Sequence, residues 1–110
     1  MGRPSSHADV FAAIAEPRRR SIIELLGREG EQPVGALVVA LDLPQPVVSK
    51  HLAVLREVGI VAVTRRGRER VYRLSPRQLK AVHDWVSTFE KHWTHQLGRI
   101  KRRAESLGNE

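Results

Sequence analysis

Hydrophobic residues in the first half of the chain recur every three or four positions, the spacing of an amphipathic helix. This periodicity predicts four helices, at residues 10–15, 17–26, 34–41 and 45–58. Pro17 stands in the first turn of the second helix, where a proline is tolerated, and Gly27 and Gly30 are expected to end that helix. Residues 42–44 then form a tight turn between the third and fourth helices, and Gly59 ends the fourth.

The pattern changes from helical spacing to alternation after the fourth helix. Residues 61–66 alternate between two sets of side chains, and residues 70–74 are rich in strand formers. The two segments predict a β-hairpin with Gly67 and Arg68 at its turn. Ahead of the third helix, the polar stretch 28–32 is expected to be a loop.

A long fifth helix is predicted after the hairpin. Ser75 is expected to cap its first turn, with Pro76 at the first position and Gln78 completing a capping box, and the helix should continue to about Leu107. Its apolar side chains fall at helical spacings and need a cover in so small a protein. Together with two residues of the first helix they predict a dimer interface: Phe11, Ile14, Val82, Trp85, Val86, Phe89, Trp93 and Leu97.

These elements predict a mainly α fold with a β-hairpin wing, a winged helix-turn-helix of five helices that dimerises through its first and last helices. Residues 1–9 are expected to be a flexible N-terminus, and residues 10–107 a single DNA-binding and dimerisation domain. A chain of 110 residues fits one domain with a modest core, which a partner subunit would enlarge.

The fourth helix is the predicted recognition helix, because its apolar side can rest on the core while the other side carries short or hydrogen-bonding residues that fit a major groove. Its predicted DNA contacts are Gln45, Pro46, Val47, Ser49, Lys50 and His51. Gln45 can pair with an adenine edge and Val47 can touch a thymine methyl group, whereas Ser49 and Lys50 suit phosphate. His51 is expected to make a phosphate or a structural contact. Taken alone, this segment would also fit a solvated helix face.

The net charge of the chain indicates a polyanionic partner. Lysine and arginine number 19 against 12 acidic residues, which gives a formal net charge of +7. Residues 65–80 hold seven basic residues and one acid, and the wing arginines expected to bind DNA are Arg65, Arg66, Arg68 and Arg70. Residues 1–6 contain no apolar core resembling a signal peptide, and no apolar run approaches the roughly 18 residues of a membrane span. Double-stranded DNA in the cytoplasm is therefore the expected partner, and no membrane.

Three blocks of residues carry a family signature. They are Ala15, 17–20, Ile23 and Leu26; 43–52, Leu55, Arg56 and 59–61; and 65–68, Tyr72 and Leu74. Together they resemble the ArsR family of bacterial winged-helix repressors. The resemblance implies a homodimeric transcriptional repressor that leaves its promoter when a small-molecule inducer arrives. Pro44 departs from the family pattern, which usually has serine or threonine there, so the recognition helix lacks a hydroxyl cap worth about 1 kcal/mol.

The last predicted helix also carries candidate metal ligands, namely His83, Asp84, His92 and His95. The resemblance implies two kinds of metal site, and the chain matches neither of them. One site needs an aspartate and a histidine where Leu79 and Ala81 stand, and the other uses cysteines, of which the chain has none. The sequence thus resembles family members without a metal site, and no metal or other cofactor is expected.

Three alternatives stay open at this point. The aromatic residues Trp85, Phe89 and Trp93 could line a pocket for an apolar inducer, although interface packing is the preferred interpretation. An enzyme is not expected, because the chain lacks cysteine, a glycine-rich phosphate loop and any recognisable set of serine, histidine and carboxylate. A protein-interaction module could use the same scaffold. The basic wing at residues 65–70 argues against that module, which has no need of so basic a tip.

Overall fold

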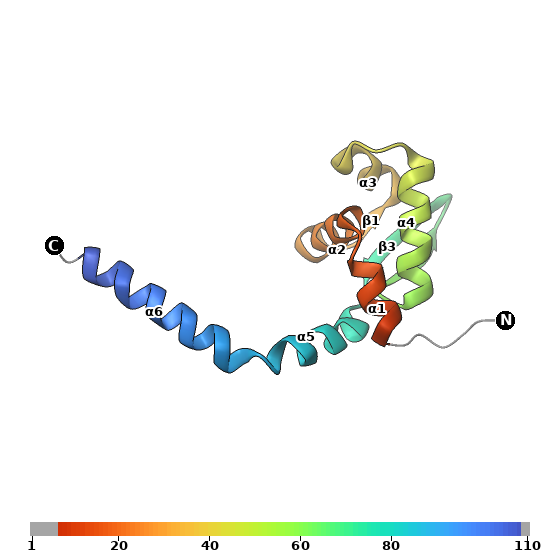
Figure 1. Ribbon diagram of the computed structural model, residues 1–110. Helices are drawn as coiled ribbons and strands as arrows, with labels where there is room; N and C mark the ends of the chain where they lie inside the picture. The colour runs from red at the N-terminus through yellow and green to blue at the C-terminus, as the bar shows by residue number, and fades with distance from the viewer. Residues whose placement is uncertain (1–6, 109–110) are drawn as a thin grey trace.

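The computed structural model describes residues 7–108, which form six α-helices, one short 3₁₀ helix and a three-stranded antiparallel sheet (Figure 1). The elements in chain order are α1 (His7–Ile14), α2 (Pro17–Glu29), β1 (Gln32–Pro33), α3 (Val34–Leu41), α4 (Gln45–Val58), β2 (Val61–Arg66), β3 (Glu69–Leu74), the 3₁₀ helix η1 (Pro76–Leu79), α5 (Lys80–Ser87) and α6 (Glu90–Gly108). The mainly α fold with a hairpin wing is confirmed, and α3 and α4 have the predicted bounds. The prediction of five helices is wrong. Residues 1–6 of the expected N-terminal segment lie outside the described residues.

The core lies where the helices of the first half of the chain meet the sheet. Its fully buried side chains are Val10, Ile22, Leu26, Leu37, Val48, Leu52, Leu55 and Ile60. Helix α4 supplies Val48, Leu52 and Leu55 from one face, as the helical spacing predicts. Burying one leucine side chain stabilises the fold by about 1.5 to 3 kcal/mol. This face therefore holds α4 on the body and leaves its opposite face to solvent.

Helices α3 and α4 form the helix-turn-helix. They are bent by 114° at the turn 42–44, inside the range of about 90 to 120° that is typical of the motif. Asp42 has a left-handed φ of 52°, and its backbone N–H bonds to the carbonyls of Val38 and Val39 at the end of α3. Within residues 7–108 no single helix is long and apolar enough to cross a membrane, and α3 with α4 reaches that size only as this bent pair.

Helix α2 runs past its predicted end. It continues through Gly27 to Glu29, so part of the loop expected at residues 28–32 is helical. The reason is that Gly30, and not Gly27, takes the positive φ of 79° that closes a helix. The backbone N–H of Gly30 then donates to the carbonyl of Leu26, a buried residue, at 3.0 Å.

The predicted hairpin is confirmed, and a third strand joins it. The sheet order is β1-β3-β2, and Gly67 has the positive φ of 62° that its two-residue turn requires. In β1, Gln32 is opposite Tyr72 and Pro33 is opposite Val71. A strand of two residues is too short to show alternation, so the sequence did not predict it.

The predicted fifth helix is divided into η1, α5 and α6, which corrects both its start and its continuity. The Ser75 hydroxyl makes no capping hydrogen bond within the described residues, and the Ser75 backbone N–H donates instead to the carbonyl of Ile60 at 2.7 Å. Between α5 and α6 the hydroxyls of Ser87 and Thr88 donate to the carbonyls of His83 and Trp85, both at 2.7 Å. Such hydroxyls compete with the helical ladder and bend or end it. Beyond this break, α6 projects away from the body (Figure 1).

Candidate nucleic-acid interface

Helix α4, the predicted recognition helix, begins on a proline carbonyl. The oxygen of Pro44 accepts hydrogen bonds from the backbone N–H groups of Val47 at 3.0 Å and Val48 at 3.1 Å. Pro46 stands in the first turn, where a backbone N–H would have no intrahelical partner. The missing N–H of proline therefore removes no hydrogen bond from the helix. The helix therefore starts at Gln45 as predicted, without the hydroxyl cap.

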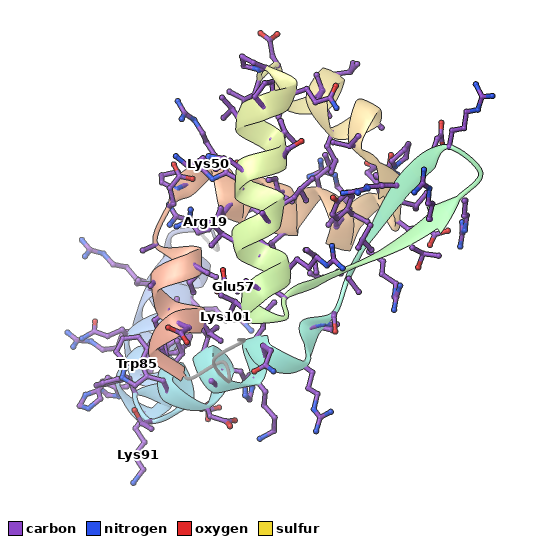
Figure 2. The ribbon with its side chains drawn as sticks, turned by 90° about the vertical axis from the view of Figure 1, so that its right-hand side faces the viewer. Arg19, Lys50, Glu57, Trp85, Lys91 and Lys101 are labelled. Atoms are coloured by element: carbon purple, nitrogen blue, oxygen red, sulfur yellow. The ribbon has the colours of Figure 1, made fainter. Side chains whose placement is uncertain are left out.

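The outer face of α4 carries most of the predicted DNA contacts. Gln45, Pro46, Ser49 and Lys50 are exposed, and Val47 is half-buried. Lys50 lies on the side of α4 away from the hairpin, together with Arg19 (Figure 2). The predicted face is thus presented to solvent along the first turns of the helix, with Lys50 at one edge of it.

His51 is the exception among these residues, because it is buried with 9% of its surface exposed. Arg19 Nη1 lies 3.4 Å from His51 Nδ1. Because arginine can only donate hydrogen bonds, His51 Nδ1 is the acceptor side of this contact. His51 Nε2 lies 3.9 Å from Glu16 Oε2. His51 was expected to make either a phosphate contact or a structural contact, and this geometry favours the structural contact.

Glu16 and Arg19 hold the α1–α2 corner against α4, and sequence reasoning missed both. Arg19 Nε donates to the carbonyl of Ala13 at 2.6 Å, and the Arg19 backbone N–H donates to Glu16 Oε2 at 3.1 Å. Burial alone would raise the pKa of Glu16. The backbone hydrogen bonds from Arg19 and Arg18 and the charge of His51 outweigh burial and hold that pKa below its usual value. The sequence does hold a signal for the role of Glu16. An acidic residue directly before Pro17 stands at the position of a helix N-cap.

A groove separates α4 from the wing. It has a volume of about 580 Å³. Its lining residues are Val34, Gln45, Ser49, Ala53, Arg56, Glu57, Arg70 and Tyr72. Residues Gln45, Ser49, Ala53, Arg56 and Glu57 lie on α4, while Arg70 and Tyr72 come from β3. The groove thus joins part of the predicted base-reading face to a wing arginine.

The wing arginines point to different sides of the hairpin. Arg65 and Arg70 are directly opposite each other, and strand alternation places them on the sheet face that carries Tyr72. Like charges opposite each other destabilise a hairpin unless an anion lies nearby. Arg66 falls on the other face, where it forms an ion pair with Glu31. Arg68 is exposed at the turn.

The predicted dimer residues divide into an inner and an outer group. Phe11, Ile14, Val82 and Val86 are half-buried, and Ile14 and Val82 pack against the core. The large side chains from α5 through the break into α6 are exposed: Trp85 by 55%, Phe89 by 45%, Trp93 by 42% and Leu97 by 59%. Trp85 packs edge-on against Phe11, with ring centroids 5.6 Å apart, and against Phe89 at 5.5 Å. The ring contacts therefore form a row from the half-buried Phe11 of α1 through the exposed Trp85 to the exposed Phe89.

The candidate metal ligands lie on two separate helices. His83 Nδ1 is 3.4 Å from Asp84 Oδ1 on α5, while His92 and His95 are exposed on α6. Hydrogen bonds from Lys80 and then His83 hold the pKa of Asp84 below its usual value. Within the described part of the chain, no three histidine or acidic side chains gather closely enough to hold a metal ion.

Comparison with known proteins identifies the family. Residues 16–63, from the end of the α1–α2 corner into β2, match the model of the bacterial regulatory proteins of the arsR family. The HTH-type transcriptional regulator Rv2034 of Mycobacterium tuberculosis is 34% identical over 100 residues, which are 91% of this chain and 90% of that protein. The chain belongs to the arsR family. The expected resemblance is thereby confirmed.

One further curated relative and one solved structure extend the comparison. The arsenic resistance transcriptional regulator ArsR1 of Pseudomonas putida is 43% identical over 82 residues, 74% of this chain and 61% of that protein. The chain spans only 54 to 61% of the length of the first curated relatives that it matches. The solution structure of the homodimeric winged helix-turn-helix DNA-binding domain of Mb0332 from Mycobacterium bovis superposes with a TM-score of 0.63 at 28% identity, over 76% of this chain and 77% of that one.

Proposed function

We propose that this protein is a homodimeric transcriptional repressor that binds duplex DNA in a sequence-specific manner through α4 and the wing. The observation that carries the proposal is the groove in which Gln45 and Ser49 of α4 stand beside Arg70 of the wing. A recognition helix needs exposed hydrogen-bonding side chains over a buried apolar face, and a wing needs cations for phosphate. Both requirements are met on one side of this molecule. The membership in a family of bacterial regulatory proteins supports the same function.

The two parts of the interface have different tasks. On α4, Gln45 and Val47 read base edges, because an amide side chain pairs with adenine and an apolar one contacts the thymine methyl group. Lys50, at the far edge of α4, binds phosphate. On the wing, the opposed arginines Arg65 and Arg70 gain an anion between or beside them and so lose the repulsion that they have in the free protein. Sequence preference therefore comes from α4, and most of the affinity comes from the wing.

Dimerisation uses the exposed aromatic row of α5 and α6 together with α1. Exposed apolar patches of this kind mark interaction sites, and a second copy of the chain carries the complementary surface by symmetry. The related Mb0332 domain is described as homodimeric. Two recognition helices held in one dimer would read two half-sites about 34 Å apart. Operator DNA lies in the bacterial cytoplasm, and we place the protein there.

Release from the operator is the remaining part of the proposal. A repressor responds when a ligand binds its DNA-free state better than its DNA-bound state. We propose a small-molecule inducer, and no enzymatic step and no resident cofactor. The 110 residues contain no cysteine, so they offer no thiolate ligand for arsenite or a similar soft metal ion.

Selection from a random-sequence duplex pool tests the proposal. The purified protein should enrich a palindromic site, and its binding should weaken steeply as salt rises, because each neutralised phosphate releases counterions. The double variant Arg65→Ala, Arg70→Ala should bind all sequences more weakly, with a salt slope lower by about 0.9 for each phosphate that is no longer neutralised. Gln45→Ala should change the enriched sequence. Arg28→Ala is the matched control, since Arg28 is exposed and paired with an acid on the body. Enrichment of no sequence, or binding that ignores salt, would refute the proposal.

A further inference from the structure

The wing arginine Arg66 is held by an acid from a distant part of the chain. Its Nη1 and Nη2 donate to Glu31 Oε1 and Oε2, the second bond at 3.2 Å, so two donors of one guanidinium meet two oxygens of one carboxylate. Glu31 directly precedes β1, and the pairing of β1 with β3 brings it beside the hairpin. Both side chains are accessible, Arg66 by 59% and Glu31 by 40%. The pair therefore sits on the surface of the wing rather than in the core.

A DNA phosphate presents nearly the same geometry to arginine as a carboxylate does. Both anions accept two parallel hydrogen bonds from the guanidinium fork. We propose that Glu31 occupies, in the free protein, the position on Arg66 that a DNA phosphate takes in the complex. Glu31 is then an internal competitor that lowers the affinity of the wing for DNA. This inference rests on the proposed function, since it needs the wing to bind DNA.

Exchange of the carboxylate for phosphate is energetically easy at this place. An exposed ion pair changes an equilibrium by no more than about fivefold, so Glu31 can be displaced. The other wing arginines, Arg65, Arg68 and Arg70, draw the polyanion toward the same hairpin. Glu69 is opposite Arg66 in the strand register, yet the arginine fork engages Glu31. Because phosphates are common to all sequences, the competition acts on affinity and leaves sequence preference unchanged.

A double-mutant cycle tests the inference. The probe is a fluorescein-labelled mixed-sequence duplex of about three helical turns at roughly 10 base pairs each, followed by fluorescence anisotropy. Glu31→Gln keeps the shape of the side chain and removes its charge, and it should bind the duplex about two to five times more tightly than wild type. In an Arg66→Ala background the same change should have no effect. Arg66→Ala alone should lower the salt slope by about 0.9.

The matched control is Glu29→Gln. Glu29 is an exposed acid close to Glu31 in sequence, but it pairs with Arg28, 3.2 Å away, and not with the wing. This control should bind DNA as wild type does, and circular dichroism should give the same spectrum for all variants.

Several outcomes would overturn the inference. Weaker binding by Glu31→Gln would mean that Glu31 positions the wing, and unchanged binding would mean that it does not compete. Tighter binding that persists in the Arg66→Ala background, or appears in Glu29→Gln, would be a general effect of removing negative charge. An unchanged salt slope in Arg66→Ala would mean that Arg66 reaches no phosphate. If wild type binds no duplex, the proposed function fails together with the inference. In each of the other outcomes wild type still binds DNA, and only the inference fails.

Discussion

Truncation of Trp93 on α6 should dissociate the proposed dimer. Trp93 is 42% exposed in the single chain, and a tryptophan side chain offers up to about 250 Å². About 100 Å² of it is therefore available for burial by a partner, worth about 2.5 kcal/mol at 25 cal/mol per Å². A two-fold symmetric interface contains the residue twice, so Trp93→Ala should cost about 5 kcal/mol per dimer. The dimer dissociation constant should rise by roughly three to four orders of magnitude.

Sedimentation equilibrium over a wide range of protein concentration measures this constant directly. Lys91→Ala is the control, because Lys91 is exposed on the same helix (Figure 2) and is not among the apolar residues of the face. Far-UV circular dichroism should show that both variants keep their helices. A Trp93→Ala variant that dimerises as tightly as wild type would refute the placement of the interface on α6, and a monomeric wild type at micromolar concentration would refute the dimer itself.

Three further predictions concern the body of the domain. Arg19→Ala should lower the free energy of unfolding, measured by urea titration, by about 1 to 3 kcal/mol, because it removes a half-buried set of hydrogen bonds at the α1–α2 corner. Arg18 is an exposed neighbour, and Arg18→Ala should change the free energy of unfolding far less. The pKa of Glu16 is lowered in the folded state, so the contribution of Glu16 to stability should be present above its usual pKa of 4.5 and disappear as the pH falls through the lower folded value. Glu16→Gln should flatten this part of the profile of stability against pH, and an unchanged profile would contradict the lowered pKa. Gly59→Ala should destabilise the domain by about 1 kcal/mol or more, because Gly59 has a φ of 92° and a new Cβ would lie 3.3 Å from a neighbouring side chain; a melting temperature equal to that of wild type would count against this.

The helix-turn-helix could be predicted residue by residue because the residues that end its helices are recognisable from the local sequence. Gly59 at a φ of 92° and the turn 42–44 end their helices through their own backbone conformations, and these are properties of short stretches of sequence. The exposure of Gln45 and Ser49 followed from helical spacing alone. The burial of His51 could have been found in the same way. Residues 48, 51, 52 and 55 share one helical face, and the other three are apolar core residues.

The break between α5 and α6 could not be predicted in this way, because apolar spacing continues across it. Val86, Phe89 and Trp93 keep intervals of three and four through the break, so the hydrophobic pattern indicates one helix. The ladder is interrupted by hydroxyl groups at 87 and 88, whose bonds to the carbonyls of the preceding turn depend on rotamers. The aromatic row nevertheless remains on one side, because Trp85 contacts Phe11 before the break and Phe89 within it.

The pairing of Glu31 with Arg66 depends on tertiary structure in a stricter sense. The two residues are 35 positions apart, and they meet only because Gln32 and Pro33 add a third strand to the hairpin. Pro33 offers no backbone N–H to the sheet, which suits the edge position that β1 occupies. Two residues of edge strand thus decide which acid faces the wing. In the sequence, Glu69 is the obvious counter-ion for the wing arginines, whereas in the folded protein β1 places Glu31 on Arg66. Under the proposed competition, the affinity of the wing for DNA depends on a residue outside both α4 and the hairpin.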